Sequence, residues 1–125
     1  MKQLTIRLEN KPGQLASVCE ALGKNGVNIT SILGGGFNGS GIVHLVTSDP
    51  MTAERALRQA GHRVVSDDVI LTRVADKPGE LAKVARKLAF NNVNVEAIYL
   101  LNRDRGSAEL VLKVNDPKAA EKALK

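Results

Sequence analysis

The chain opens with an alternation of apolar and polar residues that predicts a half-buried strand over residues 3–9. Leu4, Ile6 and Leu8 fall on one face of this strand, and polar side chains fall on the other. After Pro12-Gly13 the apolar spacing changes to i, i+3, i+4 and i+7. This spacing predicts a helix that ends near Asn25-Gly26, with an apolar face of Leu15, Val18, Cys19 and Leu22.

The next part of the chain predicts two strands, a second helix and a last short strand. The strands cover residues 28–33 and 42–47, and a glycine-rich turn joins them. Asp49-Pro50 supplies an N-cap and a first-turn proline for the helix that follows. Val64-Val65 forms the last strand. The order of elements is therefore β-α-β-β-α-β.

The same pattern then occurs a second time. Lys11-Pro12-Gly13 recurs 66 residues later as Lys77-Pro78-Gly79, and Asp49-Pro50 recurs, after a shift of one more residue, as Asp116-Pro117. Further matches at the first offset are Leu15/Leu81, Ala16/Ala82, Val18/Val84, Leu22/Leu88, Asn25/Asn91, Val27/Val93, Asn28/Asn94 and Ile32/Ile98. So many ordered matches indicate a duplicated unit.

We therefore predict an α+β protein of two tandem ferredoxin-like βαββαβ units with antiparallel sheets, over residues 1–66 and 67–125. The second unit repeats the strands at 69–74, 93–100 and 108–114, with a hairpin at 103–106 and a helix from Pro117. No segment remains for its fourth strand, so we expect that unit to lack it. A linker of only Asp67-Asp68 predicts that the two units form a fixed pair.

Composition and charge exclude several classes of function. The net charge of +5 is spread along the chain without a basic block, and aromatic residues are only 2%, so we predict no nucleic-acid binding, including by an RRM-type sheet. No apolar run approaches the ~18 residues that a membrane helix requires. One cysteine, Cys19, excludes a disulfide framework and a CxxC site. We expect a cytoplasmic protein with no cofactor, no metal site and no catalytic constellation.

The turn at residues 10–15, Asn-Lys-Pro-Gly-Gln-Leu, is the main candidate site, together with its copy at 76–81, Asp-Lys-Pro-Gly-Glu-Leu. Each turn joins a strand to the N-terminus of a helix, where free backbone N–H groups and the helix dipole favour a carboxylate. The alternative is a plain helix start, with Asn10 or Asp76 as the cap and proline in the first turn.

These turns resemble those of the ACT domain. In both halves an (N/D)-x-P-G-x-L turn is followed, after one helix, by Gly26-Val27-Asn28-Ile29 or by Asn92-Val93-Asn94-Val95. The resemblance implies a non-catalytic regulatory module that binds an amino acid or a similar small effector at interfaces between paired domains. It also implies a homodimer or a partner enzyme of amino-acid metabolism. The alternative is a structural or regulatory subunit with no ligand of its own.

The resemblance also carries site residues over to this sequence. Those predicted to bind the ligand are Asn10, Lys11, Gly13, Gln14, Leu15 and Asn28 in the first unit, and Asp76, Gly79, Glu80, Leu81 and Asn94 in the second. Some serine-binding members have a histidine where this chain has Leu8 and Val74, which argues against a serine-type site. The extra negative charges of Asp76 and Glu80 repel a carboxylate, so we favour the first turn.

Two further features lie on the second half of the first unit. Gly34 to Gly39 formally contains G-x-G-x-x-G, but a strand follows it, so we predict a mobile hairpin that could cover a ligand rather than a nucleotide site. Ile42, His44 and Val46 share the strand face opposite the helices. We predict that this face is an interface with the sister unit or with a second chain.

Overall fold

The computed structural model describes all of residues 1–125 and confirms an α+β fold built from a repeated arrangement. The chain divides into two compact units, Lys2–Asp67 and Asp68–Lys125, and Met1 groups with the latter. A hydrogen bond of 3.0 Å from Val69 N to the carbonyl oxygen of Met1 joins this residue to the second unit.

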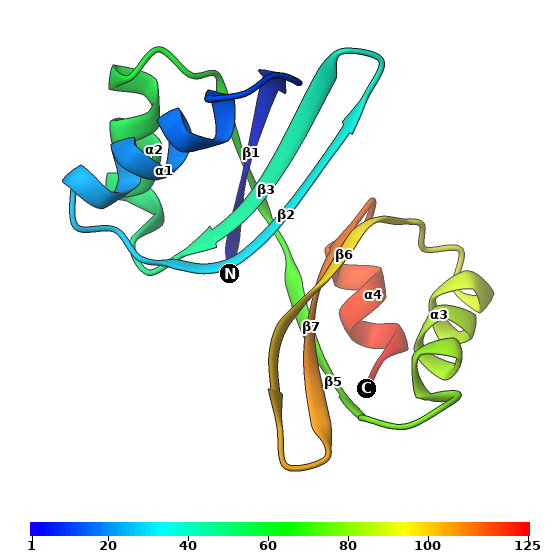
Figure 1. Cartoon of the computed structure of the whole chain (residues 1–125). Coiled ribbons are helices and arrows are strands. Elements are labelled where there is room, and N and C mark those ends of the chain that lie inside the picture. Colours follow the sequence, from blue (N-terminus) through cyan, green and yellow to red (C-terminus); the bar gives the residue numbers. More distant parts are fainter. The chain divides into compact units, whose positions relative to one another are not determined.

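The first unit has four strands and two helices. Its elements are β1 (Lys2–Glu9), α1 (Gln14–Lys24), β2 (Ile29–Phe37), β3 (Ser40–Thr47), α2 (Pro50–Gln59) and β4 (Val64–Asp68). The sheet order is β2-β3-β1-β4, and β3 runs antiparallel to both of its neighbours. The two helices cover one face of this sheet (Figure 1).

The core of the first unit is aliphatic, as the scarcity of aromatic residues requires. The predicted strand face meets Val18 and Leu22 of the predicted helix face there, whereas Leu15 is half exposed. The most deeply buried side chains are Leu4, Ile6, Val18, Leu22, Leu45 and Leu57. Removing these side chains from water is the main source of stability for a unit of this size. The opposite face of the sheet, which carries Arg7, Ile42 and His44, is not covered by α1 or α2 and is called the open face below.

The second unit repeats this plan with three strands. Its elements are β5 (Ile70–Ala75), α3 (Glu80–Phe90), β6 (Val95–Asp104), β7 (Ser107–Val114) and α4 (Pro117–Ala123). The sheet order is β5-β7-β6, so the predicted absence of a fourth strand is confirmed. Its core again gathers the helix stripe and one face of the sheet, around Val84, Leu88, Leu112 and Val114.

The predicted glycine-rich turn of the first unit is wrong. Gly34, Gly35 and Gly36 lie within β2, where they face Val43, Ile42 and Gly41 of β3. The turn is instead the dipeptide Asn38-Gly39, with φ of 52° and 78°. A two-residue hairpin whose strands twist normally requires positive φ at both positions, which Asn-Gly adopts readily. The glycines before it are therefore free to extend as a strand.

Candidate functional site

The two predicted turns share one backbone conformation, and each is docked on the tip of its own hairpin. Asn10 N donates to Gly39 O at 2.9 Å, and Asp76 N donates to Gly106 O at 2.8 Å. Each turn then reaches its helix through a left-handed glycine, Gly13 at φ 90° or Gly79 at φ 87°. A residue with a Cβ is strained at such φ values, which explains the glycine at both positions.

These glycines, and not the preceding Asn or Asp, are the N-caps of α1 and α3, and no side chain caps either helix. The cap that the plain alternative places at Asn10 or Asp76 is therefore wrong. The other two helices do have side-chain caps. Asp49 caps α2 by accepting a hydrogen bond from Thr52 N at 3.2 Å, and Asp116 caps α4 by accepting one from Ala119 N at 3.1 Å. The starts of α1 and α3 thus keep first-turn N–H groups for solvent or a ligand.

The first turn borders a cavity of about 450 Å³, which lies between the start of α1 and the β2–β3 hairpin. This turn pocket brings together four of the predicted site residues, Asn10, Lys11, Gln14 and Leu15. Its other lining residues are Leu8, Glu9, Ile32, Gly34, Gly35, Gly36, Gly41, Ile42 and Val43. Its volume lies within the range usual for small-molecule sites.

Asn10 packs directly on the backbone of β2. A Cβ built on Gly36 lies only 2.5 Å from Asn10 Nδ2 and 2.9 Å from Asn10 Oδ1. Gly36 therefore leaves the space that the asparagine side chain occupies. This role of Gly36 was not predicted, because it depends on the register of the β2–β3 hairpin.

The chemistry of the turn pocket suits a zwitterion. The uncapped start of α1 offers N–H groups to a carboxylate, and the Gln14 and Asn10 amides offer further donors. Glu9 and the Asn10 Oδ1 atom can accept from an ammonium group. Glu9 also pairs with Lys11, at 2.9 Å between Oε2 and Nζ, on the solvent-exposed side of the turn.

The second turn is closed by its own side chains. Arg103 Nε lies 2.7 Å from Asp76 Oδ2, and the cavity beside this ion pair is only about 210 Å³. Leu81 joins Asp76 in its lining, whereas Gly79 and Glu80 do not. In the hairpin register Arg103 faces Ala108, as Gly36 faces Gly41 in the first unit. An arginine thus stands where the first unit has a glycine, a difference that sequence analysis missed.

Glu80 adds negative charge at the start of α3. Its Oε2 atom lies 3.1 Å from Lys83 Nζ, and its Oε1 atom lies 3.7 Å from Lys77 Nζ. The bond from Lys83, assisted by the charges of both lysines, holds the pKa of Glu80 below its ordinary value. An ionised carboxylate at this helix start opposes the binding of a second anion, in line with the preference for the first turn.

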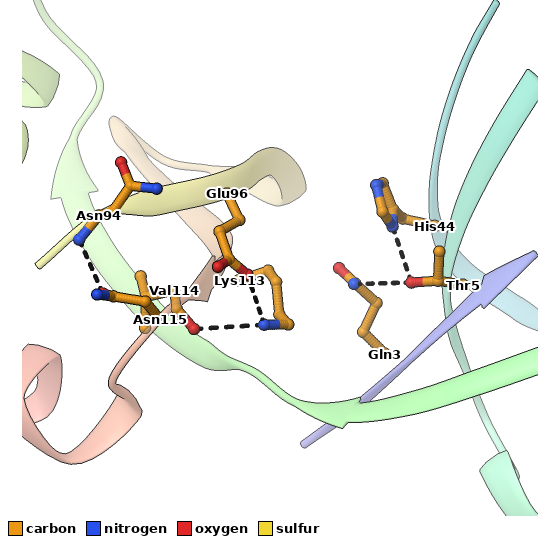
Figure 2. A network of polar contacts seen from close by, with 8 residues as sticks. All are labelled: Gln3, Thr5, His44, Asn94, Glu96, Lys113, Val114 and Asn115. Carbon is orange, nitrogen blue, oxygen red and sulfur yellow. Dashed lines mark hydrogen bonds and ion pairs between the residues drawn. The ribbon is translucent and has the colours of Figure 1, made fainter.

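The predicted asparagines at the second strand of each unit lie away from the turns. Asn28 precedes β2 at the end opposite Gly36, where its N–H donates to Ser48 Oγ at 3.0 Å. Asn94 holds the same place before β6, and its N–H donates to Asn115 Oδ1 at 2.8 Å (Figure 2). Neither asparagine lines a cavity with the turn of its own unit. Their contact with a ligand stays a prediction.

Polar contacts also organise the open face of the first sheet. Gln3 Nε2 donates to Thr5 Oγ1 at 3.1 Å, and Thr5 Oγ1 lies 3.0 Å from His44 Nδ1 (Figure 2). His44 is thus held by a side chain of the neighbouring strand. In the second unit Lys113 stands where the first has Val46, and its Nζ pairs with Glu96 Oε1 at 2.7 Å. The predicted interface role of Ile42, His44 and Val46 is not tested by these contacts.

A serine–histidine contact was also missed. Ser17 Oγ on α1 lies 3.1 Å from His62 Nε2, just after α2, and the contact ties the two helices together. Residues so far apart in the sequence give no local pattern that would have revealed it.

No group of three or more His, Cys, Asp or Glu side chains is arranged to hold a metal ion. None of the four helices has the length and apolar character needed to cross a membrane.

Comparison with known proteins agrees with the geometry. Residues 1–124 match the family described as an ACT domain pair. No curated protein matches the sequence. A crystal structure of a Bacteroides thetaiotaomicron protein is 32% identical, with a TM-score of 0.89 over 98% of this chain and 85% of that one.

Two structures of the regulatory subunit of aspartate kinase share the fold at lower identity. The subunit from Thermus thermophilus is 18% identical, with a TM-score of 0.72 over 98% of this chain and 89% of that one. The subunit from Thermus flavus is 20% identical, with a TM-score of 0.69 over the same shares.

Proposed function

Since this chain belongs to the ACT domain pair family, we propose that it is a non-catalytic regulatory module whose first unit binds a free amino acid or a similar small effector. The turn pocket is the observation that carries this proposal. There an uncapped helix start, two side-chain amides and a carboxylate surround a cavity of about 450 Å³. The lining thus offers donors for a carboxylate and acceptors for an ammonium group, the two charges of an amino acid.

The effector is proposed to act by stabilising one conformation. A ligand in the turn pocket contacts both the start of α1 and the β2–β3 hairpin, which are otherwise tied to one another by the bond from Asn10 N to Gly39 O. If the ligand binds more tightly when these elements lie closer together, it increases the population of that conformation. A partner that binds one arrangement better than another then senses the effector.

The proposed partner is an enzyme of amino-acid metabolism. Support comes from the fold shared with regulatory subunits of aspartate kinase, although the likeness in sequence is too low to assign that enzyme. A homodimeric assembly and a cytoplasmic location stay predictions. Gel filtration with light scattering tests the assembly, and a clean monomer counts against a site shared between chains.

The first experiment is a thermal-shift screen against the twenty amino acids. A ligand present at 100 times its Kd adds about 2.7 kcal/mol to the free energy of unfolding and so raises the melting temperature clearly. The variant Asn10→Asp places the charge of Asp76 in the first turn and is expected to weaken binding of the ligand's carboxylate. The matched control, Asp76→Asn in the second turn, is expected to leave the response unchanged.

A second function, that of a subunit without a ligand, is favoured by the Asp76–Arg103 pair that closes the second turn. It is the better account if no amino acid raises the melting temperature. It also requires that Gly13→Val, which strains a residue at φ 90°, leaves the regulation of a partner intact. Pull-down from the native extract, with the wild-type chain and this variant in parallel, identifies that partner.

A further inference from the structure

A second cavity, of about 530 Å³, lies on the open face of the first sheet, on the side of β2 away from α1. Its walls are mainly apolar and include Leu33, Phe37 and Ile42, beside the three glycines of β2. Arg7 brings a positive charge to the same cavity. Nothing in the proposed amino-acid site uses Arg7, so this cavity, called the open-face pocket, needs its own account.

The duplication supplies an internal comparison for this arginine. Arg7 of β1 lies directly opposite Ile42 of β3, and its counterpart Arg73 of β5 lies directly opposite Glu109 of β7. In the second unit the arginine pairs with that acid, at 3.5 Å between Arg73 Nη2 and Glu109 Oε2. In the first unit isoleucine replaces the acid, so Arg7 has no carboxylate opposite it on the sheet.

We propose that the open-face pocket binds a small monocarboxylate with an apolar chain, whose carboxylate pairs with Arg7. The ligand supplies from outside the group that Glu109 supplies within the second unit. A guanidinium fork matches a carboxylate in geometry and charge. The apolar chain lies on Leu33 and Ile42, side chains that are more than a third exposed to solvent in the empty pocket.

The lining also selects against an amino acid. Glu9 and the Asn10 side chain, which can accept from an ammonium group in the turn pocket, do not line the open-face pocket, and no other acidic residue does. An α-ammonium group in this apolar cavity therefore loses water without gaining an anionic partner. Carboxylic or 2-oxo acids with four to six carbons fit these conditions better than the amino acids of the same skeleton.

The glycines of β2 provide the room. A Cβ built on Gly35, which faces Ile42, meets no atom within 4 Å, so this position opens onto the empty space of the open face. In the register of β6 and β7, the second unit has Leu100, Asn102 and Arg103 where the first has these three glycines. The volume of the open-face pocket is within the range typical of ligand sites and sufficient for a molecule of this size.

The test measures binding of 4-methylpentanoate by isothermal titration calorimetry, with 4-methylpentan-1-ol as the neutral analogue of the same skeleton. Leucine, the zwitterionic analogue, is compared in the Asn10→Asp chain, whose turn pocket is expected to bind it weakly. The carboxylate is expected to bind at least about tenfold more tightly than either analogue. Arg7→Gln is expected to lose about tenfold or more in affinity. Ile42→Glu, which copies the second unit, is expected to abolish binding by giving Arg7 an internal partner.

Arg73→Gln is the matched control and is expected to bind the carboxylate as the wild type does. Circular dichroism and the melting temperature show whether each variant is folded; Ile42→Glu is an exposed substitution toward a residue that the sister unit already carries. The proposal is overturned if the carboxylate does not bind, if both first-unit variants bind it normally, or if Arg73→Gln weakens it equally. Asn10→Asp is expected to leave this binding intact, so the outcome is independent of the amino-acid screen.

Discussion

Replacing Gly36 by alanine tests the geometry of the turn pocket directly. The new Cβ stands 2.5 Å from Asn10 Nδ2, 2.7 Å from Cγ and 2.9 Å from Oδ1, whereas ordinary contacts begin at 3.4 Å. The Asn10 side chain must therefore move by about 0.9 Å, the difference between 3.4 and 2.5 Å. The Asn10 side chain is exposed to solvent, so it is expected to yield while the backbone of β2 stays in place.

The effect on folding is expected to be small and the effect on binding large. Moving one side chain to a less favourable rotamer costs about 0.5–1.5 kcal/mol, and about 1 kcal/mol lowers the melting temperature of a unit this size by roughly 4–8 °C. A hydrogen bond from the Asn10 amide to a charged ligand group contributes about 1.5–3 kcal/mol. Loss of this hydrogen bond lowers the affinity for the amino acid by about tenfold to a hundredfold, at about 1.4 kcal/mol for each factor of ten.

Isothermal titration calorimetry with the amino acid found by the thermal-shift screen measures this loss. Gly35→Ala is the matched control, because its Cβ meets nothing within 4 Å and points to the opposite face of β2. Equal affinities for Gly36→Ala and the wild type would refute the role assigned to Asn10. A loss as large in Gly35→Ala would show that the whole hairpin, and not the asparagine, had been disturbed.

Three further predictions follow from the side-chain contacts. The triple variant Asp76→Asn/Glu80→Gln/Arg103→Gly removes both carboxylates and the arginine from the second turn. It is expected to raise the calorimetric stoichiometry from one to two amino acids per chain, and an unchanged stoichiometry contradicts this. Asp49→Ala is expected to lower the melting temperature at neutral pH. The hydrogen bond from the Thr52 hydroxyl holds the pKa of Asp49 below its ordinary value of 3.8. The cap therefore stabilises the fold above that pH, and this contribution is lost as the pH falls through the folded-state pKa. In acid, the free energies of unfolding of the variant and the wild type, measured in urea, should converge. Burial raises the pKa of Tyr99, the sole tyrosine, to about 12. The absorbance of Tyr99 should therefore titrate near that pH in the folded chain and near about 10 in guanidinium. Since only the unfolded chain ionises between these two values, the free energy of unfolding should fall as the pH rises above about 10. Titration of the folded chain near pH 10 would exclude the burial.

The fold followed from the sequence because duplication made each weak pattern appear twice. The helix face of Leu15, Val18 and Leu22 and its copy 66 residues later could hardly both be accidental. The error at Gly34–Gly36 has a physical reason: glycine accepts turn and strand conformations alike, so composition alone does not choose between them. The Asn-Gly pair that follows is the more specific indication of a two-residue hairpin turn.

The candidate site was predicted only as far as local sequence determines it. Asn10, Gln14 and Leu15 are neighbours in the chain, and all three line the turn pocket. Asn28 lies at the far end of β2, since a family motif records residue types but not how far apart a long strand places them. The contacts of Asn10 with Gly36 depend on hairpin register, which is fixed by pairing across the sheet.

The three glycines of β2 also affect how easily this strand opens locally. β2 is an edge strand, and over Gly34–Gly36 it has no side chains to anchor it, so local opening there is expected to cost less than elsewhere in the sheet. This stretch borders the turn pocket on one face and the open-face pocket on the other. A ligand on either side should therefore slow amide hydrogen exchange in the same three residues. Whichever ligand binds first has already met the entropic cost of ordering this stretch, so the second binds with less to overcome.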